Sequence, residues 1–135
     1  MASADKKVRT IEVESKEQFA KLIKDNEFVA IDFTATWCGP CKLIGPKFNE
    51  FSVENQEVVF LKVDVDALSE IAQEYNIRAM PTFKFVRNGK EVGELVGANP
   101  TNLKKKLAEL NELAVSAKAA KTASAGEAPE AAPAA

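Results

Sequence analysis

A chain of 135 residues with an ordinary apolar content has enough interior for one domain around a single hydrophobic core. Its net charge of −2 and its interspersed acidic and basic residues argue against binding to nucleic acid or to an anionic membrane. The chain starts without an apolar signal-peptide segment and has no run of about eighteen apolar residues, so a cytoplasmic protein is expected.

The first half of the chain alternates predicted strands and helices. Residues 8–13 alternate apolar and polar side chains like a half-buried strand, and a capping box at residues 15–18 opens a helix. Residues 28–33 are almost continuously apolar, as in a central strand covered on both faces, and Asp32 is their only charge. The helix that follows from Cys38 is expected to turn one apolar face inward, made of Leu43, Ile44, Phe48 and Phe51.

The second half predicts a strand at residues 58–65 and a short helix at residues 67–75. Next, residues 82–87 and 90–96 flank Asn88-Gly89, a dipeptide that favours the turn of an antiparallel hairpin. The order predicts an α/β fold with a central mixed sheet of about five strands, flanked by about four helices.

The end of the chain separates a predicted domain from a predicted tail. A last helix is expected to begin at Asn99-Pro100 and to reach about Val115. Residues 116–135 are rich in Ala, Pro and Lys and lack large apolar side chains, so a disordered tail is expected there. The predicted domain therefore covers residues 1–115.

The only two cysteines form a Cys-x-x-Cys pair at the point where the strand at residues 28–33 hands over to a helix. This spacing places Cys38 at the helix N-terminus, where unpaired N–H groups and the helix dipole favour a thiolate. Cys38 is therefore the predicted nucleophile. Cys41 can close a disulfide with Cys38 or attack one that Cys38 has formed, so it is the predicted resolving thiol.

Two other uses of a Cys-x-x-Cys pair are weaker interpretations. A zinc site would need two further Cys or His ligands, and the chain has no His and no third Cys, so no metal is expected. A purely structural disulfide would close a loop of about four residues and would stabilise the fold by only about 2 kcal/mol. Thiol redox chemistry without a metal or an organic cofactor is the stronger prediction.

Four motifs stand out along the chain: residues 32–42, Pro46, Met80-Pro81-Thr82-Phe83 and Gly97-Ala98-Asn99. In this order and spacing they resemble the thioredoxin family, and the resemblance covers about residues 8–115. The resemblance implies a thioredoxin fold, a redox-active Cys38–Cys41 disulfide and reduction of protein disulfides by reversible dithiol–disulfide exchange. Gly39 and Pro40 between the cysteines are typical of the reducing members of the superfamily, where they tune the redox balance. Residues 33–37 and 97–99 are similar to the eukaryotic cytosolic form, although Thr34 stands where many bacterial members have Trp.

Asp32 is a candidate proton acceptor, because burial without a full set of partners would raise its pKa toward neutrality. The resemblance implies that this carboxylate lies beneath the resolving thiol and acts through water as general base for Cys41. It also implies that Lys62 is the charge partner of Asp32. A buried structural carboxylate paired with Lys62 is the alternative interpretation.

The resemblance also implies a substrate-binding surface around Cys38. It implies that the Met80-Pro81 peptide bond is cis and packs against the disulfide, which leaves backbone groups of Met80 free to pair with a substrate peptide. The residues expected around Cys38 are apolar or small: Trp37, Gly39, Pro40, Val65, Met80, Gly97 and Ala98. For Val65 and Met80 taken singly, packing in the core is the simpler interpretation.

The partners expected from the resemblance are protein disulfides as substrates and an NADPH-dependent thioredoxin reductase that re-reduces the protein, itself expected to be a monomer. A disulfide oxidoreductase is thus the leading hypothesis. One alternative is a redox-dependent binding module with the same fold and little turnover. Another is an oxidase or isomerase, which would have a markedly higher reduction potential.

Overall fold

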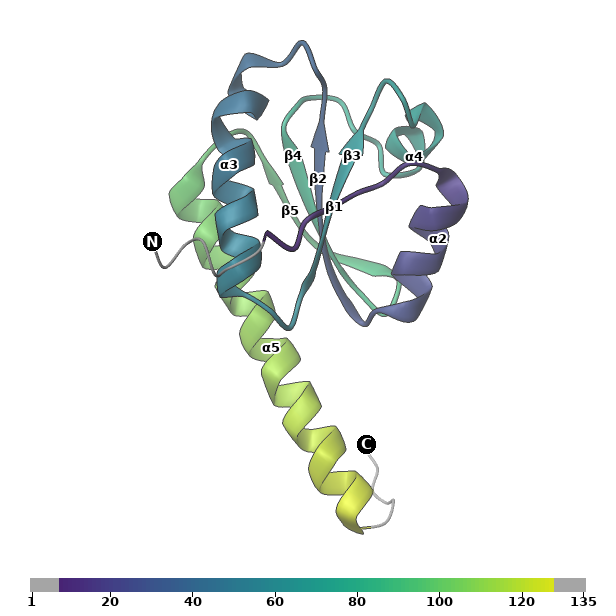
Figure 1. The fold of residues 1–135 in the computed structure, drawn as a ribbon, viewed down its shortest axis with the longest axis vertical. Helices are drawn as coiled ribbons and strands as arrows, with labels where there is room; N and C mark the ends of the chain where they lie inside the picture. Colours follow the sequence, from purple (N-terminus) through teal and green to yellow (C-terminus); the bar gives the residue numbers. More distant parts are fainter. Residues whose placement is uncertain (1–7, 128–135) are drawn as a thin grey trace.

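The computed structural model describes residues 8–127, with side chains up to residue 120 (Figure 1). Its elements follow the predicted order of strands and helices. They are β1 (Ile11–Glu12), α2 (Lys16–Asp25), β2 (Phe28–Thr34), α3 (Gly39–Glu54), β3 (Val59–Asp64), α4 (Ser69–Glu74), β4 (Thr82–Arg87), β5 (Lys90–Val96) and α5 (Pro100–Glu127). Within this described part, no helix is both long and apolar enough to cross a membrane.

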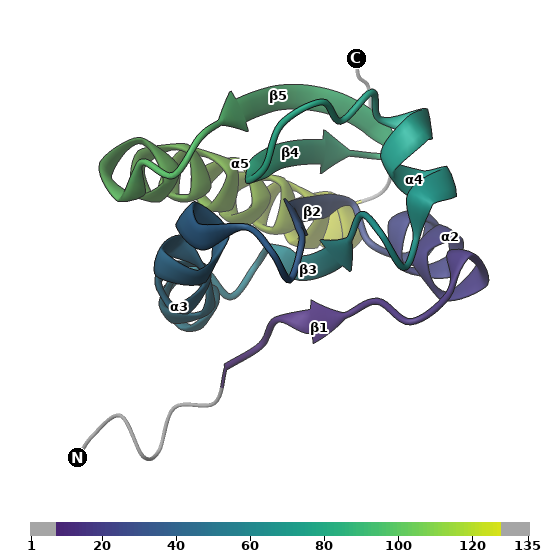
Figure 2. The ribbon, with the colours of Figure 1, turned by 90° about the horizontal axis from the view of Figure 1, so that it is seen from above.

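The five strands form one mixed sheet in the order β1-β3-β2-β4-β5. The first three strands of this order run parallel, and β4 and β5 are antiparallel to their neighbours. Figure 2 shows α3 and α5 on one side of the sheet and α2 and α4 on the other. The predicted mixed sheet with four helices is therefore confirmed.

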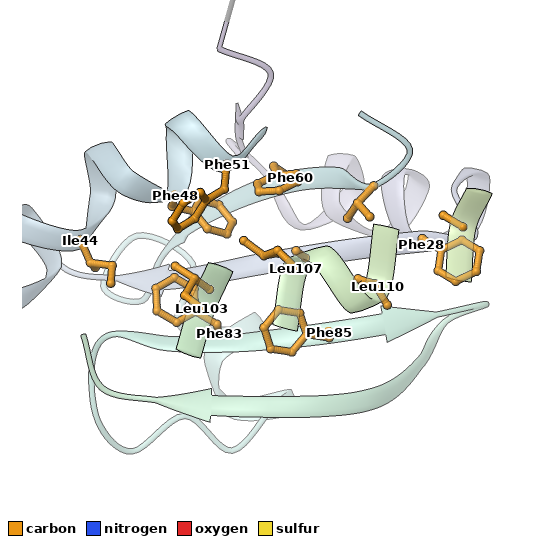
Figure 3. Packing of buried hydrophobic residues seen from close by; sticks show 13 residues of the cluster. Phe28, Ile44, Phe48, Phe51, Phe60, Phe83, Phe85, Leu103, Leu107 and Leu110 are labelled. Carbon is orange, nitrogen blue, oxygen red and sulfur yellow. The ribbon is translucent and has the colours of Figure 1, made fainter. Parts of the chain in front are cut away.

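A cluster rich in aromatic side chains fixes α3 against the sheet (Figure 3). The Phe48 ring of α3 lies 4.9 Å from the ring of Phe60 and 5.5 Å from that of Phe83, measured between centroids. Leu103 and Leu107 of α5 close the same cluster and are fully buried. This packing fixes where the first turn of α3 lies at the end of the sheet.

The prediction that Leu43 belongs to the buried face of α3 is wrong. Its exposed fraction is 79%, whereas Ile44 and Phe48 are buried. Neighbouring residues on an α-helix point about 100° apart. Ile44 and Phe48 are four residues apart and share the buried side of α3, so the side chain of Leu43 points outward.

The last helix extends further than its composition predicts. It continues to Glu127 rather than ending near Val115, so the expected disorder is corrected for residues 116–127, while residues 128–135 lie outside the described part. Alanine is the strongest helix former, and lysine and glutamate also favour helix, so this segment propagates a helix already started on the core. Ala117 packs against the aromatic cluster, and the Lys118 ammonium lies 3.5 Å from a carboxylate oxygen of Glu57.

Removing residues 118–135 is expected to lower the free energy of unfolding by less than about 1 kcal/mol, because the ion pair that is lost is exposed to solvent. Leu110→Ala, which removes a buried side chain from the same helix, is expected to lower it by about 2–5 kcal/mol. Urea unfolding of both variants measures these effects. A truncation as destabilising as Leu110→Ala would show that the end of the helix docks on the domain.

Candidate active site

The two cysteines lie at the N-terminus of α3, just beyond the carboxyl end of β2. Cys38 is the N-cap residue, and its sulfur accepts a hydrogen bond from the backbone N–H of Cys41 over 3.1 Å. Pro40 occupies the first turn, where its missing N–H removes no helical hydrogen bond. The local sequence thus starts the helix and directs its free N–H groups toward the Cys38 sulfur.

A disulfide joins Cys38 and Cys41, whose Cα atoms lie 5.3 Å apart. Each cysteine is only 4% exposed, so exposure alone does not distinguish the two. The disulfide packs with Ala35, and the partly buried side chains of Val65 and Met80 cover the same cluster. Among the described residues no group of three or more potential ligands is placed to hold a metal ion.

The two cysteines differ in their contact with a pocket that we call the Asp32 pocket. Its lining includes Asp32, Cys41 and Lys62 but not Cys38. Asp32 lies in β2, where every residue is buried, and its Oδ1 atom accepts no hydrogen bond from the part of the chain that the structure describes. Loss of solvation raises the pKa of Asp32 to about 7, and the nearby positive charge of Lys62 offsets this in part.

Lys62, the expected charge partner of Asp32, acts on it without a direct ion pair between the two described side chains. The two residues are direct neighbours in the pairing of β2 with β3, so the Lys62 charge acts on Asp32 from close by. The Lys62 ammonium instead lies 3.9 Å from a carboxylate oxygen of Glu12 on β1. Asp32 is buried and Lys62 is half exposed, so the ammonium keeps its contact with water on the outer side.

A second depression, the α4 groove, is lined in part by Val65 and Met80, which pack against the disulfide. Its lining includes Trp37, Val65, Asp66, Arg78 and Met80. Trp37 is 65% exposed, and its indole N–H donates a hydrogen bond of 2.8 Å to Asp66. A large apolar ring is therefore held in a fixed orientation beside the disulfide.

The Met80-Pro81 peptide bond is cis, as the resemblance implies. The N–H of Gly97 donates a hydrogen bond of 2.9 Å to the Pro81 carbonyl, which brings the end of β5 beside this bond. Gly97 has a φ of +103°, a backbone conformation that glycine adopts without steric cost, and Ala98 after it is exposed. By contrast, a Cβ atom added to Gly39 would meet nothing within 4 Å, so the fold itself does not require glycine there.

The sequence of this chain is similar to proteins of one known family. Residues 10–109 match the family model described as Thioredoxin. The chain belongs to the thioredoxin family. It is 47% identical over 103 residues to the H-type thioredoxin of Picea mariana, a match that covers 76% of this chain and 82% of that protein. It is 48% identical over 92 residues to Thioredoxin-1 of Schizosaccharomyces pombe, with coverage of 68% and 89%.

A solved thioredoxin has the same fold. The crystal structure of the Malassezia sympodialis thioredoxin superposes with a TM-score of 0.75 at 44% identity, covering 78% of this chain and 94% of that one. With its family membership and the Cys38–Cys41 disulfide, this chain is a protein disulfide reductase that works by reversible dithiol–disulfide exchange. The predicted family, fold and activity are thereby confirmed.

Two residues of this thioredoxin site carry no signal in the sequence. Asp66, the acceptor for Trp37, follows it by 29 positions. Glu12, the partner of Lys62, lies 50 residues before it on another strand. Neither belongs to a motif, and only the pairing of three strands and the turn after β3 bring them to the site.

Proposed function

We propose that Cys38 is the nucleophile that attacks protein disulfides and that Cys41 resolves the mixed disulfide. One observation carries this assignment. Cys38 caps α3 and its sulfur accepts a hydrogen bond from an N–H group of the first turn, whereas Cys41 lines the Asp32 pocket. After reduction, the helix N-terminus stabilises a thiolate on Cys38. Cys41 lines the same pocket as the Asp32 carboxyl, which can take its proton.

The reaction proceeds in two exchanges. The Cys38 thiolate attacks one sulfur of the substrate disulfide, the substrate S–S bond breaks, and the other substrate sulfur leaves as a thiolate that takes up a proton. Cys41 then loses its proton and attacks the Cys38 sulfur, which breaks the mixed disulfide and releases the second substrate thiol. The substrate gains two electrons and two protons, and the protein is left with its Cys38–Cys41 disulfide.

Asp32 is proposed as the acceptor of the Cys41 proton, through water in the Asp32 pocket. A carboxyl with a pKa of about 7 exchanges a proton near neutral pH, whereas an exposed aspartate is already ionised there. The orphan Oδ1 atom supports this role, because no hydrogen bond from the described residues commits it to a structural partner. The positive charge of Lys62 on the neighbouring strand lowers the pKa of Asp32 and so limits the rise caused by burial.

Substrate binding is assigned to the apolar surface beside Cys38. Trp37, Val65 and Met80 line the α4 groove, where an extended peptide that carries the disulfide can lie. Gly97 and Ala98 continue this surface beside the cis peptide bond, and the buried Pro81 is assigned to hold Met80 and Gly97 in place there. Gly39 and Pro40 are assigned to tune the redox balance of the pair. The proposed electron donor is an NADPH-dependent thioredoxin reductase, and the proposed location is the cytoplasm.

Reduction of insulin disulfides in the presence of dithiothreitol tests the activity. The protein is expected to accelerate insulin precipitation well above the rate with dithiothreitol alone, and a Cys38→Ser variant is expected to abolish the acceleration. A folded protein that adds nothing to the background rate would be a redox-dependent binding module instead. Oxidation of NADPH in the presence of thioredoxin reductase tests the proposed electron donor separately.

A further inference from the structure

Three charged residues form one row across three neighbouring strands. Glu12 of β1 pairs in register with Lys62 of β3, and Lys62 pairs in register with Asp32 of β2. All three follow the alternation that places Ala30 and Phe60 on the α3 side of the sheet, and all three line the Asp32 pocket. One ammonium group therefore stands between two carboxyl groups.

The Lys62 ammonium forms an ion pair with only one of these two carboxyl groups in the described chain. Its ammonium nitrogen lies 3.9 Å from Glu12, whereas no ion pair joins it to Asp32, both residues being within the described chain. Side-chain exposure follows the same order: Glu12 is 76% exposed, Lys62 is 44% exposed and Asp32 is buried. The ammonium is thus paired with the outer carboxylate, and the Oδ1 atom of the inner carboxyl has no hydrogen-bond donor among the described residues.

We propose that Glu12 is a positioning residue that holds the Lys62 ammonium away from Asp32, so that the Asp32 carboxyl stays unpaired and free to exchange a proton with Cys41. The proposal deepens the function proposed above and rests on Asp32 as the proton acceptor. A direct ion pair between Lys62 and Asp32 would keep the carboxylate ionised, which would make it a poorer proton carrier near neutral pH. Glu12 prevents that pairing although it touches neither sulfur.

Other charges around Asp32 do not replace this effect. The remaining titratable or charged groups that line the pocket are Cys41 and Lys42 of α3 and Asp64 at the end of β3. On the β4 side the register neighbour of Asp32 is the uncharged Phe83. Among the described residues, Lys62 is the charge that shifts the pKa of the Asp32 carboxyl, in the downward direction, so its position decides how strongly that carboxyl is held ionised.

The test is a titration of the Asp32 carboxyl by carbon-13 NMR in the oxidised protein, where no thiol titrates. Glu12→Gln keeps the side-chain size and removes the charge that holds Lys62, so the pKa of Asp32 is expected to fall by about one pH unit or more. Glu112→Gln is the matched control: it removes an exposed carboxylate of α5 that does not line the pocket, and it is expected to leave the titration unchanged. An unchanged pKa of Asp32 in Glu12→Gln would overturn the proposal.

A second pair of variants separates positioning from a direct effect of the Glu12 charge. Lys62→Gln alone is expected to raise the pKa of Asp32, because it removes the charge that lowers that pKa. In this background, Glu12→Gln should have no further effect if Glu12 acts through Lys62. The same fall in both backgrounds would mean that the Glu12 charge acts on Asp32 directly, and it would overturn the positioning role.

The rate of mixed-disulfide resolution as a function of pH completes the test. In Glu12→Gln the pH dependence of this step should move to lower pH together with the NMR titration. A different result would contradict the proposed function, namely that an Asp32→Asn variant resolves the mixed disulfide as fast as the parent protein. That outcome would remove Asp32 from the mechanism, whereas the NMR titrations would still decide whether Glu12 positions Lys62.

Discussion

A Cys41→Ser variant is expected to remain covalently attached to its protein substrates and to lose essentially all turnover. Cys38 keeps the N–H group and the helix dipole of α3, so it still attacks disulfides. The thiol that would break the resulting mixed disulfide is gone, and the adduct persists. Adducts formed in a cell lysate can be isolated on the tagged variant, released with reductant and identified, which also gives the list of substrates.

Cys38→Ser is the matched control and is expected to capture far less. This comparison tests the helix-terminus argument directly, because the two cysteines are equally buried and differ in their surroundings. Equal capture by the two variants would contradict the assignment of nucleophile and resolving thiol. If neither folded variant captured protein, a binding module without turnover would be the better description.

The fold was predictable because local patterns and long-range pairing agree. The almost continuously apolar run of residues 28–33 became the buried central strand β2, and Asn88-Gly89 placed the turn between β4 and β5 where the structure has it. Periodicity failed at Leu43, since an apolar residue next to an inward-facing one can lie on the outside. The composition of the tail was misleading at the end of α5, where the helix preference of alanine extends a helix that has no further apolar face to bury.

The candidate site was predictable only where the chain itself brings residues together. Cys38 and Cys41 share one turn of helix, so their spacing alone indicates a disulfide. Asp32 could be singled out because it is the only charged residue in an otherwise apolar strand. The partner of Lys62 could not be predicted, because the pairing of β1 with β3 decides between Glu12 and Asp32 and leaves no trace in the local sequence.

Replacing Asp32 with Asn is expected to slow the resolving step more than the first attack on substrate. Cys41 loses its proton acceptor, whereas the helix N-terminus that activates Cys38 is unchanged. A general base typically accelerates a proton transfer by about 10²–10⁴-fold, so the loss should approach the lower end of that range where solvent water replaces the carboxylate. Rapid-quench measurement of mixed-disulfide formation and decay separates the two steps, and an equal slowing of both would contradict this role.

The same substitution is expected to stabilise the oxidised protein at pH 8. The folded state binds the Asp32 proton with a pKa of about 7, above the ordinary value of 3.8 that the unfolded chain has. Between these values the folded state holds a proton that the unfolded state has released, so the parent loses stability as the pH rises from about 4 to about 7. From pH 5 to pH 8 this group alone lowers the free energy of unfolding by roughly 3 kcal/mol.

Asparagine does not ionise, so the variant should lack this decline, although its buried amide has a desolvation penalty of about 1–3 kcal/mol. Urea unfolding at pH 5 and pH 8 measures both terms, and an equal decline in parent and variant would mean that the folded state does not hold the Asp32 carboxyl in its neutral form.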